Sequence, residues 1–410
     1  MSTSVLSPSS GRPITIVIPD ASTSTVGLVR LSDLGGTTSG RAVQGNDPRL
    51  GNPGSASTAM AIWAGTGAGG DAALDGSTVV SWGSWSTISG VRTLTVTFAG
   101  VIEIDTLTWD FTAYSSIAII TKGALFVIRS IVTVGTGTAY ADWAGGNASG
   151  SAGGNGAAQV SAVSPLGGGG NGANGRGTSG IGSSAAGFNS GVCFGGVGGA
   201  GGAVPTAAGG SGGGFTRDYV PGLHSGGSLS DIMFWGGSQP WTAPTARSTY
   251  HISGGSGGGA GGNQVTGTSG GSGAGAGAIL WRVGSIDMGA NTLYIRAIGG
   301  SGAAASSVSG AGTSAGGGGG GGGSIMLVAA SVTGTVILQA HGGPGGAGVS
   351  ADADVAAGGL GGNGGLVACI YGTGTAPTGT ATGGTGGTGS DATPASNGSD
   401  GTVYIVPATF

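Results

Sequence analysis

The feature that most constrains this chain is a run of eight glycines, residues 316–323, followed almost directly by the apolar residues 325–328. Glycine loses more backbone freedom on folding than any other residue, so such a run stays disordered unless neighbouring backbone orders it. The 410 residues include 102 Gly and 14 Pro, which is close to the composition of low-complexity chains. A folded structure therefore needs a means of ordering glycine.

The rest of the composition opposes disorder. Disordered chains combine low hydrophobicity with high net charge, whereas this chain is 38% hydrophobic, 7% charged and carries a net charge of -4. Lys122 is the one lysine and Glu103 the one glutamate, so two of the residue types that favour helices are almost missing. The composition predicts a folded chain without long amphipathic helices.

A repeat is present within the glycine-rich sequence. Four segments, which start at Ala124, Ala278, Ser324 and Leu366, each show an apolar strand, a short turn, a threonine, a second strand and Gly-Gly; a fifth, from Thr402, holds the first strand alone. The first strands are apolar at nearly every position, which predicts burial on both faces. In the second strands apolar residues alternate, which predicts one buried face. The aligned threonines are Thr138, Thr292, Thr335 and Thr380, and the alternating sets are Ala139/Ala141/Trp143, Leu293/Ile295/Ala297 and Val336/Leu338/Ala340.

Units this short cannot bury their own apolar faces, so they must stack. The predicted fold is all-β: a β-helix-like solenoid of strand repeats over residues 124–410, with a large glycine-rich excursion at 145–277. Glycine tracts held side by side by such a solenoid can form polyproline II bundles that hydrogen-bond backbone to backbone; floppy loops are the alternative. We expect residues 53–123 to be a linker and a β-rich capping region, and residues 1–52 to be a separate N-terminal module.

Residues 14–51 carry the sequences STSTVGLVRLSDLGGT and AVQGNDPRL. They resemble short modules near the N-termini of bacteriophage tail-fibre proteins, which usually join fibre to virion. The glycine-rich remainder resembles uncharacterised phage proteins that alternate strand pairs with Gly-Gly-rich loops. More loosely it resembles the adhesins at the tips of T-even-type long tail fibres, whose receptor-binding region is a sandwich of polyproline II glycine helices.

This resemblance implies a virion protein without enzymatic activity, located in a tail fibre or other external fibre. Its N-terminus would attach to tail, neck or baseplate proteins, and its host partner would be a surface glycan or an outer-membrane protein. A homotrimer is expected by analogy with phage fibres.

Residues 215–251 concentrate aromatic and charged side chains in a chain that is otherwise poor in both. Aromatic residues and arginine dominate recognition surfaces, so we predict that this stretch binds the receptor. The alternative is a small satellite core or a contact between subunits. The candidate binding residues are Phe215, Arg217, Tyr219, His224, Phe234, Trp235, Trp241, Arg247 and Tyr250.

Other chemistry has little support in the sequence. His224, His251 and His341 lack the spacing of a metal site, and no motif for a cofactor stands out, so neither is expected. The chain has no basic stripe for nucleic acid, no apolar run long enough to span a membrane and no N-terminal export signal. Cys193 and Cys369 are far apart and are expected to be free, with a disulfide as the alternative.

Two other functions remain open. The carboxylate pairs Glu103/Asp105 and Asp352/Asp354 would suit a glycan depolymerase, in which two carboxylates flank the scissile bond. A purely structural spacer, whose host contact is made by another protein, is the second alternative.

Overall fold

The computed structural model describes residues 69–160, 164, 166–175, 195–213, 254–264, 267–306, 312–351 and 354–407, together with four short strands before residue 69. Those four are β1 (Thr3–Leu6) with β2 (Pro13–Ile16), and β3 (Arg30–Leu31) with β4 (Gly40–Arg41), each pair antiparallel. The described residues contain strands and no helix, which confirms the all-β class. In the same residues there is accordingly no helix able to cross a membrane.

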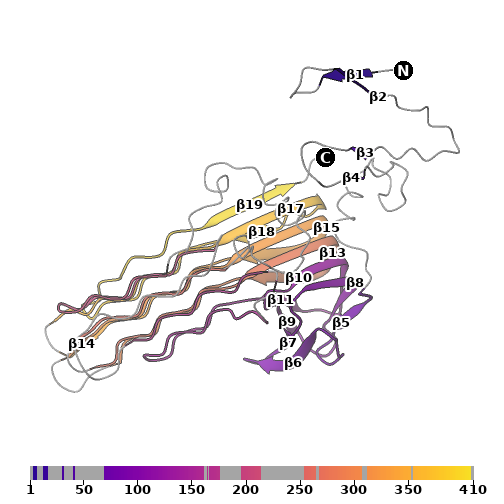
Figure 1. Cartoon of the computed structure of the whole chain (residues 1–410). Helices are drawn as coiled ribbons and strands as arrows, with labels where there is room; N and C mark the ends of the chain where they lie inside the picture. The colour runs from indigo at the N-terminus through magenta and orange to yellow at the C-terminus, as the bar shows by residue number, and fades with distance from the viewer. Residues whose placement is uncertain are drawn as a thin grey trace.

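The core is a curled mixed sheet of twelve strands, seen at one end of the molecule in Figure 1. The hairpin of β6 and β7 is antiparallel, and the other strand pairs of this sheet are parallel. A separate, small antiparallel sheet joins β12 (Asn263–Gln264), β14 (Thr313–Ser314) and β16 (Val349–Ser350). The twelve strands are β5 (Ala72–Leu74), β6 (Gly83–Ile88), β7 (Val91–Val96), β8 (Val101–Asp110), β9 (Ser116–Ile120), β10 (Leu125–Val134), β11 (Thr138–Asp142), β13 (Ala278–Arg296), β15 (Ser324–Gln339), β17 (Leu366–Gly374), β18 (Thr378–Thr380) and β19 (Thr402–Pro407).

The predicted repeat starts lie on neighbouring strands. Ala278 lies opposite Ser324, Ser324 opposite Leu366, and Leu366 opposite Thr402, so this part of the alignment is confirmed. The first copy is shifted by one residue. Leu125, one residue after the predicted start at Ala124, pairs with Leu280, which lies two residues after the start at Ala278.

The aligned threonines are correct for three of the four copies. Thr138 lies opposite Thr292, and Thr292 lies opposite Thr335. The position of Thr380 was wrong, since it lies opposite Gln339. The turn between the first and the second strand differs in length from copy to copy. Counting residues from the start of a repeat therefore does not give the register of its second strand.

The burial pattern follows the predicted periodicity. In β15, Val336 and Leu338 are buried and the intervening Ile337 is half-buried. The first strands are buried on both faces as predicted: Leu327 is 0% exposed on one face and Met326 4% on the other. Trp281 packs within 5.5 Å of the Phe126 ring, measured between ring centroids, in the centre of the core.

A glycine in the left-handed region recurs where a first strand turns into its second strand. The four are Gly135 (φ 75°), Gly289 (φ 53°), Gly334 (φ 88°) and Gly374 (φ 96°). Residues with a Cβ rarely adopt this conformation. The turn that separates the two strands of each repeat therefore depends on glycine.

Hydrogen bonding continues past the ends of the second strands into the glycine-rich segments, which run side by side away from the sheet (Figure 1). The N–H groups of Ala297 and Gly299 donate to Gln339 and His341, two residues apart as in a strand. The next donors, Gly302 and Ala305, bind Pro344 and Ala347, three residues apart. The backbone thus passes from a period of two to a period of three without an interruption in pairing.

The eight central glycines lie among six other segments. Successive N–H groups donate to three different segments in turn, so that every third donor binds the same segment. Seven of the carbonyls accept from three further segments, at residues 196–202, 273–276 and 343–346, and that of Gly323 accepts from Leu366. A Cβ on any of the eight would overlap neighbouring backbone atoms. Close backbone packing is therefore what orders this run. The donors pair as follows: Gly317, Gly320 and Gly323 with Ala303, Gly300 and Ala297; Gly318 and Gly321 with Gly259 and Ser256; Gly316, Gly319 and Gly322 with Ala357, Leu360 and Asn363.

We call the hydrogen-bonded glycine-rich segments the glycine lattice. Its outgoing layer consists of the segments that leave the second strands, at residues 144–150, 297–306, 340–348 and 381–389.

Candidate functional site

The nine predicted receptor-binding residues, from Phe215 to Tyr250, lie outside the described residues, so their role stays a prediction. The lattice does hold both ends of the stretch that contains them. The N–H of Gly213 donates to Gly257, and the hydroxyl of Ser256 donates to the carbonyl of Gly213. Gly255 in turn donates to Ala276, two residues before β13. Both ends are therefore fixed near the sheet.

Of the other residues considered in the sequence, His251, Cys193 and Asp352 also lie outside the described part of the chain. Cys369 is a free thiol in the core, where burial raises its pKa to about 12. The thiolate is the reactive form of cysteine, so this residue acts as a core side chain. Among the described residues, no group of three or more His, Cys, Asp and Glu could hold a metal ion.

Glu103 and Asp105 lie on β8, with Glu103 exposed and Asp105 partly exposed. Asp105 forms an ion pair of 3.0 Å with Arg129, its neighbour in register on β10. Both side chains are about half exposed, and such pairs contribute little to stability. Glu103 also lines a cavity of about 360 Å³ together with Asp71, Trp82 and Phe98.

The structure also shows an exposed surface that the sequence did not predict. The outward residues of β11, β13, β15 and β18 continue in register into the outward residues of the outgoing layer. All of them are partly or fully exposed. We call this surface the array face. Its rows are Tyr140, Tyr294, Ile337, Thr378; Asp142, Arg296, Gln339, Thr380; Ala144, Ile298, His341, Thr382; Asn147, Ser301, Pro344, Thr385; and Ala304, Ala347, Thr388.

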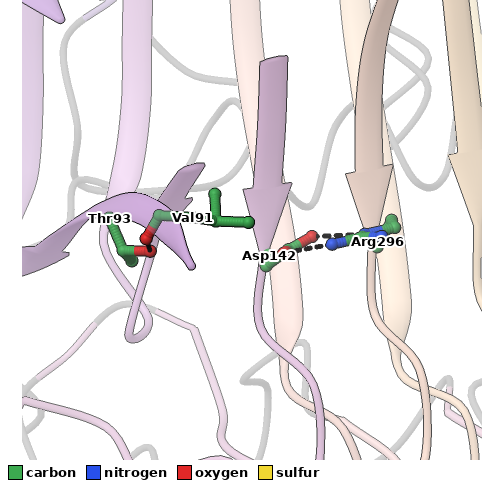
Figure 2. Close-up of polar contacts among 4 residues, drawn as sticks. All are labelled: Val91, Thr93, Asp142 and Arg296. Carbon is green, nitrogen blue, oxygen red and sulfur yellow. Dashed lines mark hydrogen bonds and ion pairs between the residues drawn. The ribbon is translucent and has the colours of Figure 1, made fainter. Parts of the chain in front are cut away.

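The strand end of the array face carries its large side chains. The rings of Tyr140 and Tyr294 stack, with centroids 5.4 Å apart and 18° between planes, and the guanidinium of Arg296 lies 4.2 Å from the Tyr140 centroid. Arg296 donates from Nε and Nη2 to the two oxygens of Asp142, at 2.7 and 2.6 Å, as Figure 2 shows. The hydrogen bonds that Arg296 donates to Asp142 raise the pKa of Arg296. The two charges thus neutralise each other within the face.

Figure 2 also shows a local contact on β7, where the hydroxyl of Thr93 donates to the carbonyl of Val91 at 3.0 Å. Thr93 is 3% exposed, so its hydroxyl needs such a partner. This contact lies within one strand and is separate from the array face.

In the third and fourth rows, a side chain of one segment caps an N–H group of the next. Nδ1 of His341 accepts from the N–H of Thr382 at 3.1 Å, and Oδ1 of Asn147 accepts from the N–H of Ser301 at 2.9 Å. Pro344, which follows Ser301 in the fourth row, has no N–H group to cap. The face therefore presents hydroxyl, amide and imidazole groups on a backbone that hydrogen bonds hold in place. Such groups can form hydrogen bonds with a ligand.

The array face has a sequence signal that could have identified it. Non-glycine residues recur every third position in the tracts after the second strands, as in His341, Pro344 and Ala347 or in Thr382, Thr385 and Thr388. A period of three is that of the polyproline II helix. The outward residues are found by counting every second residue along a second strand and every third residue in the glycine-rich tract after it.

Comparison of the chain with protein-family models, with curated proteins and with solved structures finds no match.

Proposed function

We propose that this protein is a non-enzymatic component of an external bacteriophage fibre, which projects a rigid glycine-rich structure and binds the surface of the host cell. Residues 1–52 would attach it to tail, neck or baseplate proteins of the virion, and a homotrimer is expected by analogy. The resemblance of residues 14–51 to fibre modules supports the attachment role. The glycine lattice is the observation that carries the proposal, because its backbone bonds give stiffness with almost no side chains.

We further propose that the parallel strands are successive turns of a β-solenoid and that the lattice segments are polyproline II helices. The in-register pairing of β13, β15, β17 and β19 supports the solenoid. In 316–323 every third N–H group donates to the same neighbouring segment, which supports polyproline II with its three residues per turn.

Receptor contact is assigned in this proposal to the nine residues between Phe215 and Tyr250. Support comes from their chemistry and from the fixed ends of the stretch at Gly213 and Ser256. A lattice supplies shape but little side-chain area, so a recognition surface has to use the few large side chains of the chain.

The test is a Trp235→Ala/Trp241→Ala double variant. We expect a folded protein that is still incorporated into particles, with adsorption to host cells reduced on the order of thirtyfold for each lost anchor. Loss of folding or of assembly would instead indicate a satellite core or a subunit contact. Unchanged adsorption would indicate a spacer.

The location in the virion is tested by electron microscopy of particles labelled with an antibody against this chain. Label on a tail, neck or capsid fibre is expected. Label elsewhere on the particle, or none, would contradict the proposal.

The glycan depolymerase is the second candidate, because Glu103 and Asp71 line one cavity together with Trp82 and Phe98. Its test is whether the purified protein lowers the viscosity of host capsule or lipopolysaccharide, and whether Glu103→Gln abolishes that effect.

A further inference from the structure

We infer that the array face binds an uncharged polysaccharide, whose chain lies along the outgoing segments of the glycine lattice. This inference rests on the proposed host-binding function. It assigns a ligand chemistry to a surface separate from residues 215–251.

The chemistry of the face matches that of a sugar polymer. A sugar offers hydroxyl groups around apolar ring faces, so its binding surface needs hydrogen-bonding groups and apolar patches side by side. Ser301 and Thr385 flank Pro344 in one row of the array, and His341 lies beside Ile298 in the row before it. In these two rows polar and apolar side chains therefore lie next to each other.

The charge of the face selects among polymers. Asp142 and Arg296 neutralise each other through two hydrogen bonds, and the other positions of the array carry no formal charge. A face without net charge does not attract anionic polymers from a distance. An uncharged glycan is therefore favoured over an acidic one and over nucleic acid.

The dimensions favour a linear ligand over a protein. From Tyr294 to Ile298 the chain has the period of two of a strand, at ~3.3 Å per residue, although β13 itself ends at Arg296. From Ile298 to Ala304 it has a period of three, at ~3.1 Å per residue, and the two parts together give roughly 30 Å. Stable protein interfaces use about 20 to 30 residues a side and are anchored by large aromatic or arginine residues. Beyond its first two rows the array offers mostly Ala, Ser, Thr and Pro, which suits an extended chain.

The lattice also lowers the cost of binding. Ligands lose affinity when loops and long side chains have to be ordered on contact. Here the N–H groups of Gly302, Gly345 and Gly348 are already hydrogen-bonded to the next segment, which fixes the rows. Serine, threonine and proline side chains have little freedom left to lose.

The test is affinity electrophoresis of the full chain in gels that contain a neutral polysaccharide (dextran, mannan or galactan) or an anionic one (alginate or hyaluronan). Thr385→Arg and Ser301→Arg place a long charged side chain on the array face and leave the lattice interior unchanged. Thr375→Arg is the matched control, because Thr375 is exposed on the same repeat but lies in the turn between β17 and β18. Thermal melting of each variant checks that it is folded.

We expect at least one neutral polysaccharide to retard the protein, with an affinity lowered about tenfold or more by Thr385→Arg and by Ser301→Arg and unchanged by Thr375→Arg. Three results would overturn the inference: no retardation by any neutral polysaccharide, retardation by the anionic polymers alone, or binding that both folded face variants retain. A concentration-dependent dimer that Thr385→Arg dissociates would also overturn it, since the face would then bind a second copy. Absence of the chain from virion fibres contradicts the proposed function instead, so the two failures are distinguishable.

Discussion

Gly319 illustrates, at the scale of one residue, why the central run tolerates no side chain. Its N–H donates to Leu360 and its carbonyl accepts from Gly199, so its backbone is bonded on two sides. A Cβ at this position would overlap the carbonyl oxygen of Gly343. The obstacle is backbone, which cannot move aside as a flexible side chain can.

We therefore expect Gly319→Val to lower the free energy of unfolding by about 3 kcal/mol or more, at the upper end of overpacking effects. The control is Ala304→Val, which adds bulk at an exposed, outward position of a neighbouring segment. Urea unfolding of both variants measures the difference. Equal stability of the two would contradict the lattice and favour a loop.

His341 provides a pH dependence. Burial lowers its pKa in the folded protein below the usual value near 6.5, while the unfolded chain keeps the ordinary value. The unfolded state therefore binds the proton more readily. The contribution of His341 to stability is complete above about pH 6.5 and is lost as the pH falls through the lowered folded pKa.

Thermal melts between pH 8 and pH 4.5 check this expectation. The wild type should lose more stability on acidification than His341→Asn, whose amide oxygen is attached to Cγ as Nδ1 is, can still accept from the N–H of Thr382, and does not titrate. Identical pH profiles would show that protonation of His341 is not linked to folding.

At the scale of the element, β15 joins the two parts of the molecule. Its first half lies in the core between β13 and β17, and its second half presents Leu338 to the core and Gln339 to the array face. The strand therefore has one apolar face throughout and a changing outer face.

Leu338→Asp should destabilise the protein by several kcal/mol, because it buries an unpaired charge at a position that is 0% exposed. Gln339→Asp places the same carboxylate one residue later on the outer face, and we expect a change within about 1 kcal/mol. Denaturant unfolding compares the two. A Leu338→Asp variant as stable as Gln339→Asp would contradict the burial of this strand face.

At the scale of the whole molecule, sheet and lattice form one hydrogen-bonded body. The ladder between residues 297–305 and 339–347 crosses from strand to lattice without a missing bond. Segments joined in this way should open together rather than one by one.

Hydrogen exchange tests this cooperativity. We expect the amides of residues 316–323 to exchange as slowly as those of β15, and Leu338→Asp to accelerate both. Exchange of the glycine amides orders of magnitude faster than that of the strand would show that the lattice opens independently.

The sequence by itself determined the strands. The apolar runs and the alternation at Val336 and Leu338 were sufficient for the all-β class, for the buried faces and for the order β13, β15, β17, β19, because side-chain burial in strands follows a period of two. The receptor-binding role of the nine residues between Phe215 and Tyr250 remains a prediction from residue chemistry.

The tertiary structure alone decided what surrounds each glycine and which residues share the array face. Because glycine has no side chain, a run of glycines shows no pattern of apolar and polar positions. The six segments that surround residues 316–323 therefore cannot be predicted from the sequence of that run. Tyr140 and Tyr294 are 154 residues apart in the chain and stack because the parallel pairing of β11 and β13 sets their register. Register across so long a connection is fixed by the packing of the whole core, which no local sequence pattern contains.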